Sequence, residues 1–135
     1  RRKPLSAAAR RAGWVGCNIL LSEIPKSGRI ALIERGNPRP KAEVLRRWAA
    51  TKFVSDRVAD ASKGWLLATM RVVDHLGVAE FNLADVYAHE LEFLRLYPNN
   101  RNVRPKLRQQ LQRLRDAGYI EFLGAGRYRR CTSDE

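Results

Sequence analysis

The segment that most constrains the fold is the C-terminal third of the chain, residues 104–130, with the sequence RPKLRQQLQRLRDAGYIEFLGAGRYRR. If each residue advances by about 100° around a helix, four apolar side chains fall into one narrow stripe. These are Val103, Leu107, Leu111 and Leu114. The stripe predicts a helix over residues 102–117 with one face packed on a core. Gly118 is expected to end it, because glycine readily adopts the left-handed backbone that follows a helix.

The opposite face of this predicted helix is polar. It carries Asn102, Pro105, Gln109, Gln112 and Asp116, flanked by Lys106 and Arg113 on one side and by Arg108 and Arg115 on the other. Basic side chains can neutralise phosphates or donate to guanine, and glutamine can form paired hydrogen bonds with adenine in a major groove. Such a face therefore suits a DNA duplex, although a solvated polar face has the same composition.

Two short segments after the helix predict a β-hairpin. Residues 119–123 and 127–130 have strand character, and they are separated by Gly-Ala-Gly, which favours a tight turn. Arginines at 127, 129 and 130 make this hairpin a second basic element beside the helix. Helix and hairpin together strengthen the prediction of a nucleic-acid contact.

Further helices are predicted upstream. Residues 64–76 have a helical apolar face, formed by Leu66, Met70 and Val73 and followed by Gly77. Phe81 is expected in a short extended segment. Asn82, with Asp85 three residues later, resembles a capping box that begins a helix over residues 83–97, which Pro98 ends. We expect that helix to bury Val86, Tyr87, Leu91 and Leu94. This order of elements is that of a winged helix, so the predicted fold class is mainly α with a small β-hairpin wing.

The N-terminal part has a different pattern. Residues 14–21 and 28–33 are apolar runs of strand length, and GNPRP at 36–40 is expected to break any regular element. Residues 41–52 predict a helix with Val44, Leu45 and Trp48 on one face. Residues 53–61 are weakly patterned. We therefore expect three parts: residues 1–52, a linker over 53–61, and the winged helix over 62–131.

The charge is concentrated in two blocks. The chain has 26 Lys and Arg against 14 Asp and Glu, a formal net charge of +12, which indicates a polyanionic partner. Residues 1–35 carry a net charge of +6 and residues 101–130 a net charge of +7, whereas residues 36–100 carry only +1. Each basic block is therefore a separate candidate contact surface.

Several function classes find no support. The two cysteines, Cys17 and Cys131, are far apart and form no Cys/His cluster, so neither a zinc site nor a disulfide framework is predicted. No apolar run approaches the roughly 18 residues of a membrane span, and no secretory signal is present. The chain opens at Arg1 without a methionine, so we expect it to be a fragment. We expect a cytoplasmic, nucleoid-associated location.

The N-terminal basic block contains an aromatic residue among its arginines. In RRKPLSAAARRAGWVGCNI, Arg10 and Arg11 shortly precede Trp14. A core tryptophan with solvated arginines is one interpretation. The other is a base contact, because an indole can stack on a displaced base or lie against a methyl group.

Several strings in the chain resemble a known family. RKPL…ARRAGWVGCNI, S…P…GRI, RQQLQ.LRD and IEF.G.G.YR are similar to the C-terminal part of the DpnI-type, or Dam-replacing, restriction endonucleases. The resemblance spans almost the whole chain. It implies an N-terminal PD-(D/E)xK nuclease domain, of which residues 1–52 are the C-terminal remnant, followed by a winged helix. It also implies cleavage of GATC in double-stranded DNA when the adenine is methylated, with a divalent metal such as magnesium.

The resemblance also implies roles for individual residues. Trp14 matches a tryptophan that lies near the methylated adenine in the family. Asn102, Lys106, Arg108 and Gln109 lie where the family's recognition helix faces DNA. With the flanking basic and amide residues, the predicted DNA-binding set is Arg101, Asn102, Arg104, Lys106, Arg108, Gln109, Gln112, Arg113, Arg127 and Arg129. Arg10, Arg11 and Trp14 form a second set, the candidate contacts to the methylated base.

The catalytic motif of the family is absent from this sequence. It needs an Asp and a D/E-x-K, whose carboxylates hold the metal, and no Asp or Glu here is followed two residues later by Lys. The family's Cys-rich zinc site is absent too, and we expect both to lie upstream of Arg1. This chain should therefore bind DNA without cutting it and without a cofactor of its own. Its oligomeric state stays open, and a monomer is the favoured arrangement. Two alternatives stay open: a winged-helix transcriptional regulator, and an RNA-binding winged helix with no nuclease.

Overall fold

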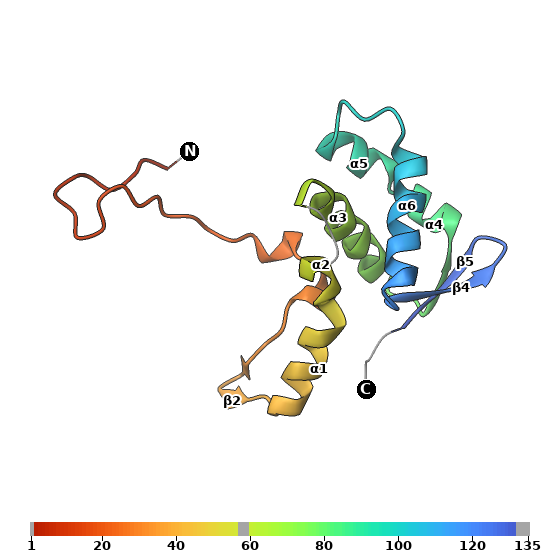
Figure 1. Ribbon diagram of the computed structural model, residues 1–135, viewed down its shortest axis with the longest axis horizontal. Helices are drawn as coiled ribbons and strands as arrows, with labels where there is room; N and C mark the ends of the chain where they lie inside the picture. Colours follow the sequence, from red (N-terminus) through yellow and green to blue (C-terminus); the bar gives the residue numbers. More distant parts are fainter. Residues whose placement is uncertain (1, 57–59, 132–135) are drawn as a thin grey trace.

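The structure is a computed structural model, and it describes residues 2–56 and 60–131. The N-terminal part contains η1 (Leu21–Glu23), η2 (Lys26–Gly28), β1 (Ile33–Glu34), β2 (Asn37–Pro38), α1 (Lys41–Thr51) and α2 (Phe53–Asp56). The C-terminal part contains α3 (Asp60–Leu76), β3 (Glu80–Asn82), α4 (Leu83–Tyr87), α5 (Glu90–Leu96), α6 (Val103–Asp116), β4 (Ile120–Gly124) and β5 (Arg127–Arg130). This second series confirms the predicted winged-helix order (Figure 1).

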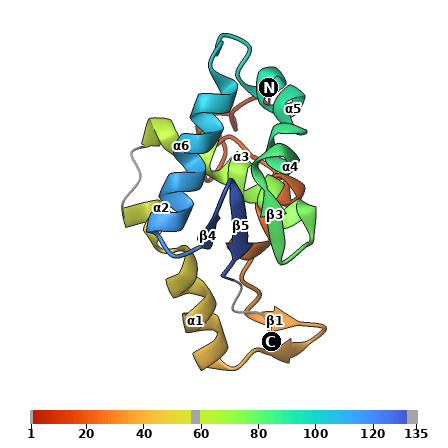
Figure 2. The ribbon, with the colours of Figure 1, turned by 90° about the vertical axis from the view of Figure 1, so that its right-hand side faces the viewer.

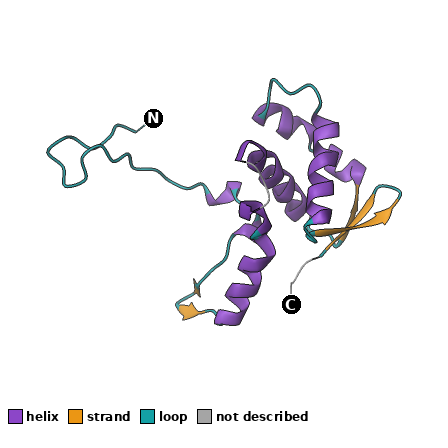
Figure 3. Ribbon diagram, in the orientation of Figure 1, coloured by secondary structure: helices purple, strands orange, loops and turns teal. Residues whose placement is uncertain are grey.

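The strands form two small antiparallel sheets, and helices make up most of the remaining regular structure (Figure 3). In the larger sheet, β5 lies between β3 and β4, with Tyr128 opposite both Phe81 and Phe122. The hairpin turns through Ala125 and Gly126, which both have positive φ. The predicted Gly-Ala-Gly turn is therefore confirmed, and β4 continues one residue further than expected.

The core of the winged helix lies where α3 packs against α6. The predicted stripe of α6 is buried along its length, and Leu107, Leu111 and Leu114 have no exposed surface. Leu66 and Met70 of α3 are equally buried, as predicted. Full burial of one such side chain stabilises the fold by about 1.5–3 kcal/mol, so this stripe determines how α6 is oriented.

The start of the helix predicted over residues 83–97 is confirmed, and α4 begins at Leu83 after Asn82. The Asn82 side chain accepts a hydrogen bond from the backbone N–H of Asp85 at 3.1 Å, and the Asp85 carboxylate accepts one from the N–H of Asn82 at 2.8 Å. This reciprocal pair is the predicted capping box. It satisfies two backbone donors that a helix start would otherwise leave unpaired.

The rest of that helix differs from the prediction. It is broken at Ala88 and His89 into α4 and α5, and Leu91 and Leu94 are exposed rather than buried. Phe93 takes the buried position instead, with its ring stacked 5.5 Å from that of Trp65. A larger aromatic ring buries more area than leucine and can stack, which explains why the helix turns Phe93 towards the core.

The predicted N-terminal strands are also wrong. Residues 14–20 form no strand, and only Ile33 of the predicted segment 28–33 belongs to one. Conversely, Asn37 and Pro38 form β2, although the segment 36–40 was expected to lack regular structure. An apolar run becomes a strand only where another strand satisfies its backbone groups. No such partner lies beside residues 14–20 among the described residues.

The helix predicted over residues 41–52 is confirmed as α1, but none of its side chains is buried, and Leu45 and Trp48 are about half exposed. The predicted linker 53–61 is partly helical. It contains α2 and the first residues of α3, while residues 57–59 lie outside the described part. The predicted boundaries of the three parts stay predictions.

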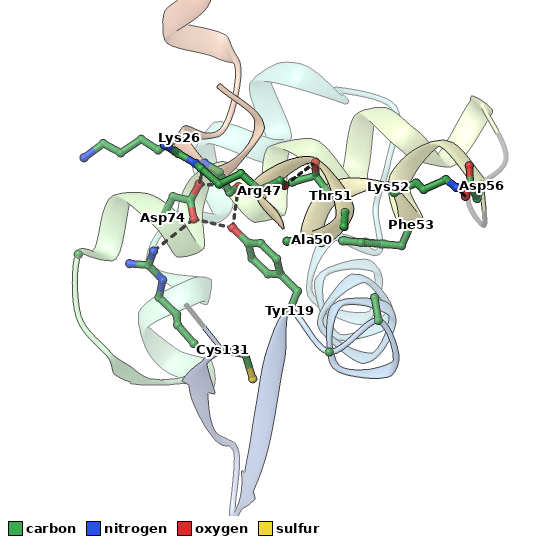
Figure 4. A pocket seen from close by; sticks show the side chains of 16 residues that line it. Lys26, Arg47, Ala50, Thr51, Lys52, Phe53, Asp56, Asp74, Tyr119 and Cys131 are labelled. Carbon is green, nitrogen blue, oxygen red and sulfur yellow. Dashed lines mark hydrogen bonds and ion pairs between the residues drawn. The ribbon is translucent and has the colours of Figure 1, made fainter. Parts of the chain in front are cut away.

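A buried carboxylate joins the N-terminal part to the winged helix. Asp74 of α3 is 4% exposed and accepts hydrogen bonds from the backbone N–H and the hydroxyl of Ser27, both at 3.1 Å. It also accepts one from the Tyr119 hydroxyl at 2.6 Å (Figure 4). The Arg130 guanidinium lies 3.7 Å from the same carboxylate. Burial, followed by the hydrogen bond to Asp74, raises the pKa of the Tyr119 phenol. We call this group the Asp74 clasp.

The clasp borders a cavity of about 640 Å³ between the α1–α2 region and the C-terminal end of α6 (Figure 4). Three of its lining cations are paired: Lys52 with Asp56 at 3.7 Å, Arg47 with Glu43 at 4.0 Å, and Arg130 with Asp74. The cavity is therefore a gap between two parts of the chain, and ion pairs within the protein already hold three of the cations that line it.

Burial predicts very different effects for two leucines. Leu111→Ala should lower the free energy of unfolding by about 2–5 kcal/mol, because it leaves a cavity in the core between α3 and α6. Leu91→Ala, at a side chain that is 67% exposed, should change it by no more than about 0.5 kcal/mol. Urea denaturation followed by circular dichroism measures both. A large loss at Leu91 would contradict the break between α4 and α5.

Candidate nucleic-acid interface

The predicted DNA-facing side chains of α6 lie on its outer face, opposite the buried stripe. Arg108, Gln109 and Gln112 are exposed, while Lys106 and Arg113 are half-buried. Asn102, the residue before the helix, is exposed as well. In Figure 2, α6 and the β4–β5 hairpin are on the face turned to the viewer, so helix and wing can approach one partner together.

Several of these cations have no partner within the protein. Across residues 2–56 and 60–131, no hydrogen bond or ion pair involves the side chains of Arg101, Lys106, Arg108 or Arg127. A guanidinium or ammonium group without an internal carboxylate keeps its full charge for a polyanion. We define these four residues as the free cation set.

Arg104 differs from that set, although it was predicted to bind DNA. Its Nε donates to the Glu90 carboxylate at 2.8 Å, and its guanidinium lies 5.1 Å from the centre of the Tyr87 ring. It therefore connects α6 to α4 and α5. Its predicted role in DNA binding is not tested by this geometry, but a contact to phosphate would compete with Glu90.

Arg129, predicted as a wing contact, is held by two carboxylates. Strand pairing places it opposite Glu80 on β3 and Glu121 on β4, and its guanidinium lies 2.8 Å and 3.3 Å from these carboxylates. The hydrogen bond to Glu80 raises the pKa of Arg129 further. Arg127 lies on the same face of β5, closer to the turn and without such partners. It is therefore the better-placed wing cation.

Two arginines of α6 influence a tyrosine of the sheet. Burial raises the pKa of Tyr128 on β5, and the nearby charges of Arg115 and Arg108 partly oppose that rise. Arg115 is paired with its neighbour Asp116 at 2.8 Å, which leaves Arg108 as the free cation of the two. Arg108 is thus the α6 cation without an internal partner whose charge acts on Tyr128 of the wing.

The N-terminal candidates lie elsewhere. Arg10, Arg11 and Trp14 belong to a loop that is closed by the hydrogen bond from the Leu5 N–H to the Trp14 carbonyl at 2.7 Å. Trp14 is 60% exposed, and the Arg11 guanidinium lies 4.7 Å from the centre of its ring. Figure 1 shows this loop on the opposite side of α3 from the β4–β5 hairpin. The structure therefore does not bring the two predicted sets together.

Gln110 is a polar residue of α6 that the sequence prediction omitted. Its side chain is completely buried, yet it contacts two predicted DNA-facing residues, Gln109 and Arg113, through hydrogen bonds. The position of residue 110 around the helix could have indicated its burial. At about 100° per residue, position 110 lies about 60° from Leu107, at the edge of the buried stripe.

The described residues contain no group of three or more His, Cys, Asp or Glu side chains that could hold a metal ion. Cys17 and Cys131 are both exposed thiols. Over the same residues, no helix has the length and apolar character needed to cross a membrane.

Comparison with protein-family models agrees with this geometry. Residues 61–130 match the model described as the Dam-replacing HTH domain, which covers the winged helix from α3 to β5. Residues 1–57 match the model described as the Dam-replacing family. The chain belongs to the Dam-replacing family. In this member of the Dam-replacing family, the HTH domain is the winged helix, and its partner is DNA.

The two wing arginines should contribute unequally to DNA binding. Arg127→Ala should weaken binding to every duplex and reduce the slope of log K against log salt by about 1, because it removes one phosphate contact. Arg129→Ala should have a smaller effect on both quantities, because its charge is already shared with Glu80 and Glu121.

Fluorescence anisotropy over a series of salt concentrations measures both slopes. A larger effect at Arg129 would show that DNA displaces the two glutamates and that Arg127 is the minor wing contact.

Proposed function

We propose that this chain is the methyl-directed DNA-binding part of a DpnI-like restriction enzyme, and that α6 reads adenine-methylated GATC from the major groove. The observation that carries the proposal is the outer face of α6. There the amides of Gln109 and Gln112 lie between free cations, next to a wing that carries Arg127. Amides discriminate between base edges, whereas cations position a protein on the phosphate backbone.

The dimensions of α6 suit this role. Its 14 residues span about 21 Å at 1.5 Å per residue, and a major groove about 12 Å wide admits a helix. The buried stripe faces α3, so the opposite face can enter the groove without unfolding the core. In this pose Arg127 would lie near the adjacent backbone.

The expected methyl preference can be bounded from burial energies. One buried methyl group contributes about 0.8 kcal/mol, which corresponds to roughly fourfold in affinity. A stronger preference requires contacts to both methyl groups of the palindrome, or a pocket that packs poorly without them. The second surface, formed by Arg10, Arg11 and Trp14, is the candidate for an additional contact.

We further propose that residues 1–52 belong to a nuclease domain, as their family match suggests. We assign no catalytic step to them, because the described residues offer no metal-binding carboxylate cluster. A monomer that uses one helix and one wing for each site is the simplest arrangement for this surface. The function proposed for the chain is therefore recognition of DNA.

Adenine methylation provides the direct test. Four duplexes that differ only in GATC methylation (none, either strand, both strands) should bind with affinities that rise by about fourfold or more for the fully methylated site at fixed salt. Equal affinity for all four duplexes would eliminate methyl recognition by this chain. Structured RNA and an unrelated duplex serve as competitors. Preference for the RNA would favour an RNA-binding winged helix. Preference for a longer, unmethylated operator would favour a transcriptional regulator.

Gln109→Ala tests base recognition by α6. If Gln109 contacts a base edge, this variant should lose about 1–3 kcal/mol of discrimination at one base pair while keeping its salt slope. Arg127→Ala is the matched control, because it should weaken the site duplex and an unrelated duplex by the same factor. A sequence-independent loss for Gln109→Ala would instead make the outer face of α6 a backbone contact.

A further inference from the structure

Gln110 is the one fully buried amide in the described part of α6. Its side chain has 0% exposed surface, whereas its neighbour Gln109 is exposed and Arg113, one turn later, is half-buried. A buried amide that loses its hydrogen bonds destabilises the fold, because water cannot replace them. Gln110 therefore restricts the orientation of the side chains that form hydrogen bonds with it.

The partners of Gln110 are two of the proposed DNA-facing side chains. Arg113 donates from Nη1 to Gln110 Oε1 at 3.4 Å, and Gln110 donates from Nε2 to Gln109 Oε1 at 3.4 Å. A guanidinium can only donate, so the amide oxygen of Gln110 must face Arg113. The amide nitrogen must then face Gln109, which has to present its oxygen. The chain of donors and acceptors has only one direction.

This direction determines what Gln109 offers to a partner. Because Gln109 accepts with its oxygen, that oxygen is turned towards the buried Gln110, and the two N–H groups of its Nε2 are left without a partner among the described residues. We propose that Gln110 is a positioning residue, which holds Gln109 as a hydrogen-bond donor towards DNA and holds the Arg113 guanidinium beside it. The inference rests on the proposed binding of DNA by α6.

A glutamine that is held with its N–H groups towards the groove suits a methylated adenine. Paired recognition of unmethylated adenine uses the glutamine oxygen to accept from the N6 amino group and the nitrogen to donate to N7. N6-methyladenine keeps a single N–H, and base pairing with thymine uses it. The acceptors left in the major groove are purine N7, guanine O6 and thymine O4. Gln109, as Gln110 holds it, can donate to each of these and does not require an adenine N–H.

The test compares purine N7 readout in three variants. The probe is a fully methylated GATC duplex, together with copies in which one purine at a time is replaced by its 7-deaza analogue, which lacks the N7 acceptor. The measured quantity is the ratio of the two dissociation constants at fixed salt. The variants are Gln110→Met, which removes both hydrogen bonds, Gln110→Glu, which can accept from Arg113 but cannot donate to Gln109, and Arg113→Met, which removes the donor that orients Gln110.

The wild-type chain should bind one 7-deaza duplex about tenfold more weakly, as expected for one base contact. All three variants should lose most of that ratio. Thr69→Val is the matched control, because it removes a buried hydrogen bond, from the Thr69 hydroxyl to the Trp65 carbonyl at 2.8 Å, on α3 and away from the outer face of α6. It should keep the full ratio.

Three outcomes overturn the inference. The first is a wild-type chain that binds the site but is insensitive to every 7-deaza purine. The second is a folded Gln110→Glu or Gln110→Met variant that keeps the tenfold ratio. The third outcome matters if both Gln110 variants unfold. It is an Arg113→Met variant, at a half-buried position, that keeps the wild-type ratio of dissociation constants. Failure of the proposed function looks different, because the wild-type chain would then not distinguish the GATC duplex from an unrelated one.

Discussion

The packing of one apolar stripe of α6 against α3 is the contact on which the rest of the winged helix depends. Leu107, Leu111 and Leu114 are completely buried in it, so rotation of α6 about its axis would expose leucine and bury charge. This single constraint turns the opposite face, with Gln109 and Gln112, towards solvent. The β4–β5 hairpin follows directly from the end of α6, which places the wing next to that face. The candidate site is therefore a consequence of core packing.

Internal pairing then divides the arginines into two groups. Glu80 and Glu121 hold Arg129, and Glu90 holds Arg104, whereas Arg108 and Arg127 have no carboxylate partner in the described part of the chain. Net charge alone does not show this division, because every arginine counts equally in it. Carboxylate pairing also occurs inside the protein. The Asp74 clasp uses a buried carboxylate to gather groups from three segments, and it anchors the N-terminal part on the winged helix.

The predictions that were confirmed rest on local or periodic signals. The capping box at Asn82 needs only residues three apart, and the stripe of α6 repeats along a single helix. The predictions that were wrong needed a partner that lies far away in the sequence. Residues 14–20 have strand composition but no strand beside them, and Phe93 displaced Leu91 from the core because Trp65 offers it a stacking surface. For the candidate site, the sequence identified the outer face of α6 but could not show that Arg129 is paired or that Gln110 is buried.

The sequence by itself determined the helical periods, the caps, the turn residues and the two basic blocks, because each depends on neighbouring positions or on composition. It also carried the motifs that place the chain in the Dam-replacing family. Only the tertiary structure decided which arginines are free, which aromatic residue enters the core, and that the loop of Trp14 lies apart from α6. These properties depend on contacts between segments tens of residues apart, such as Glu80 with Arg129 and Asp74 with Ser27. The periodicity of residues along the chain does not predict contacts between segments that are far apart in the sequence.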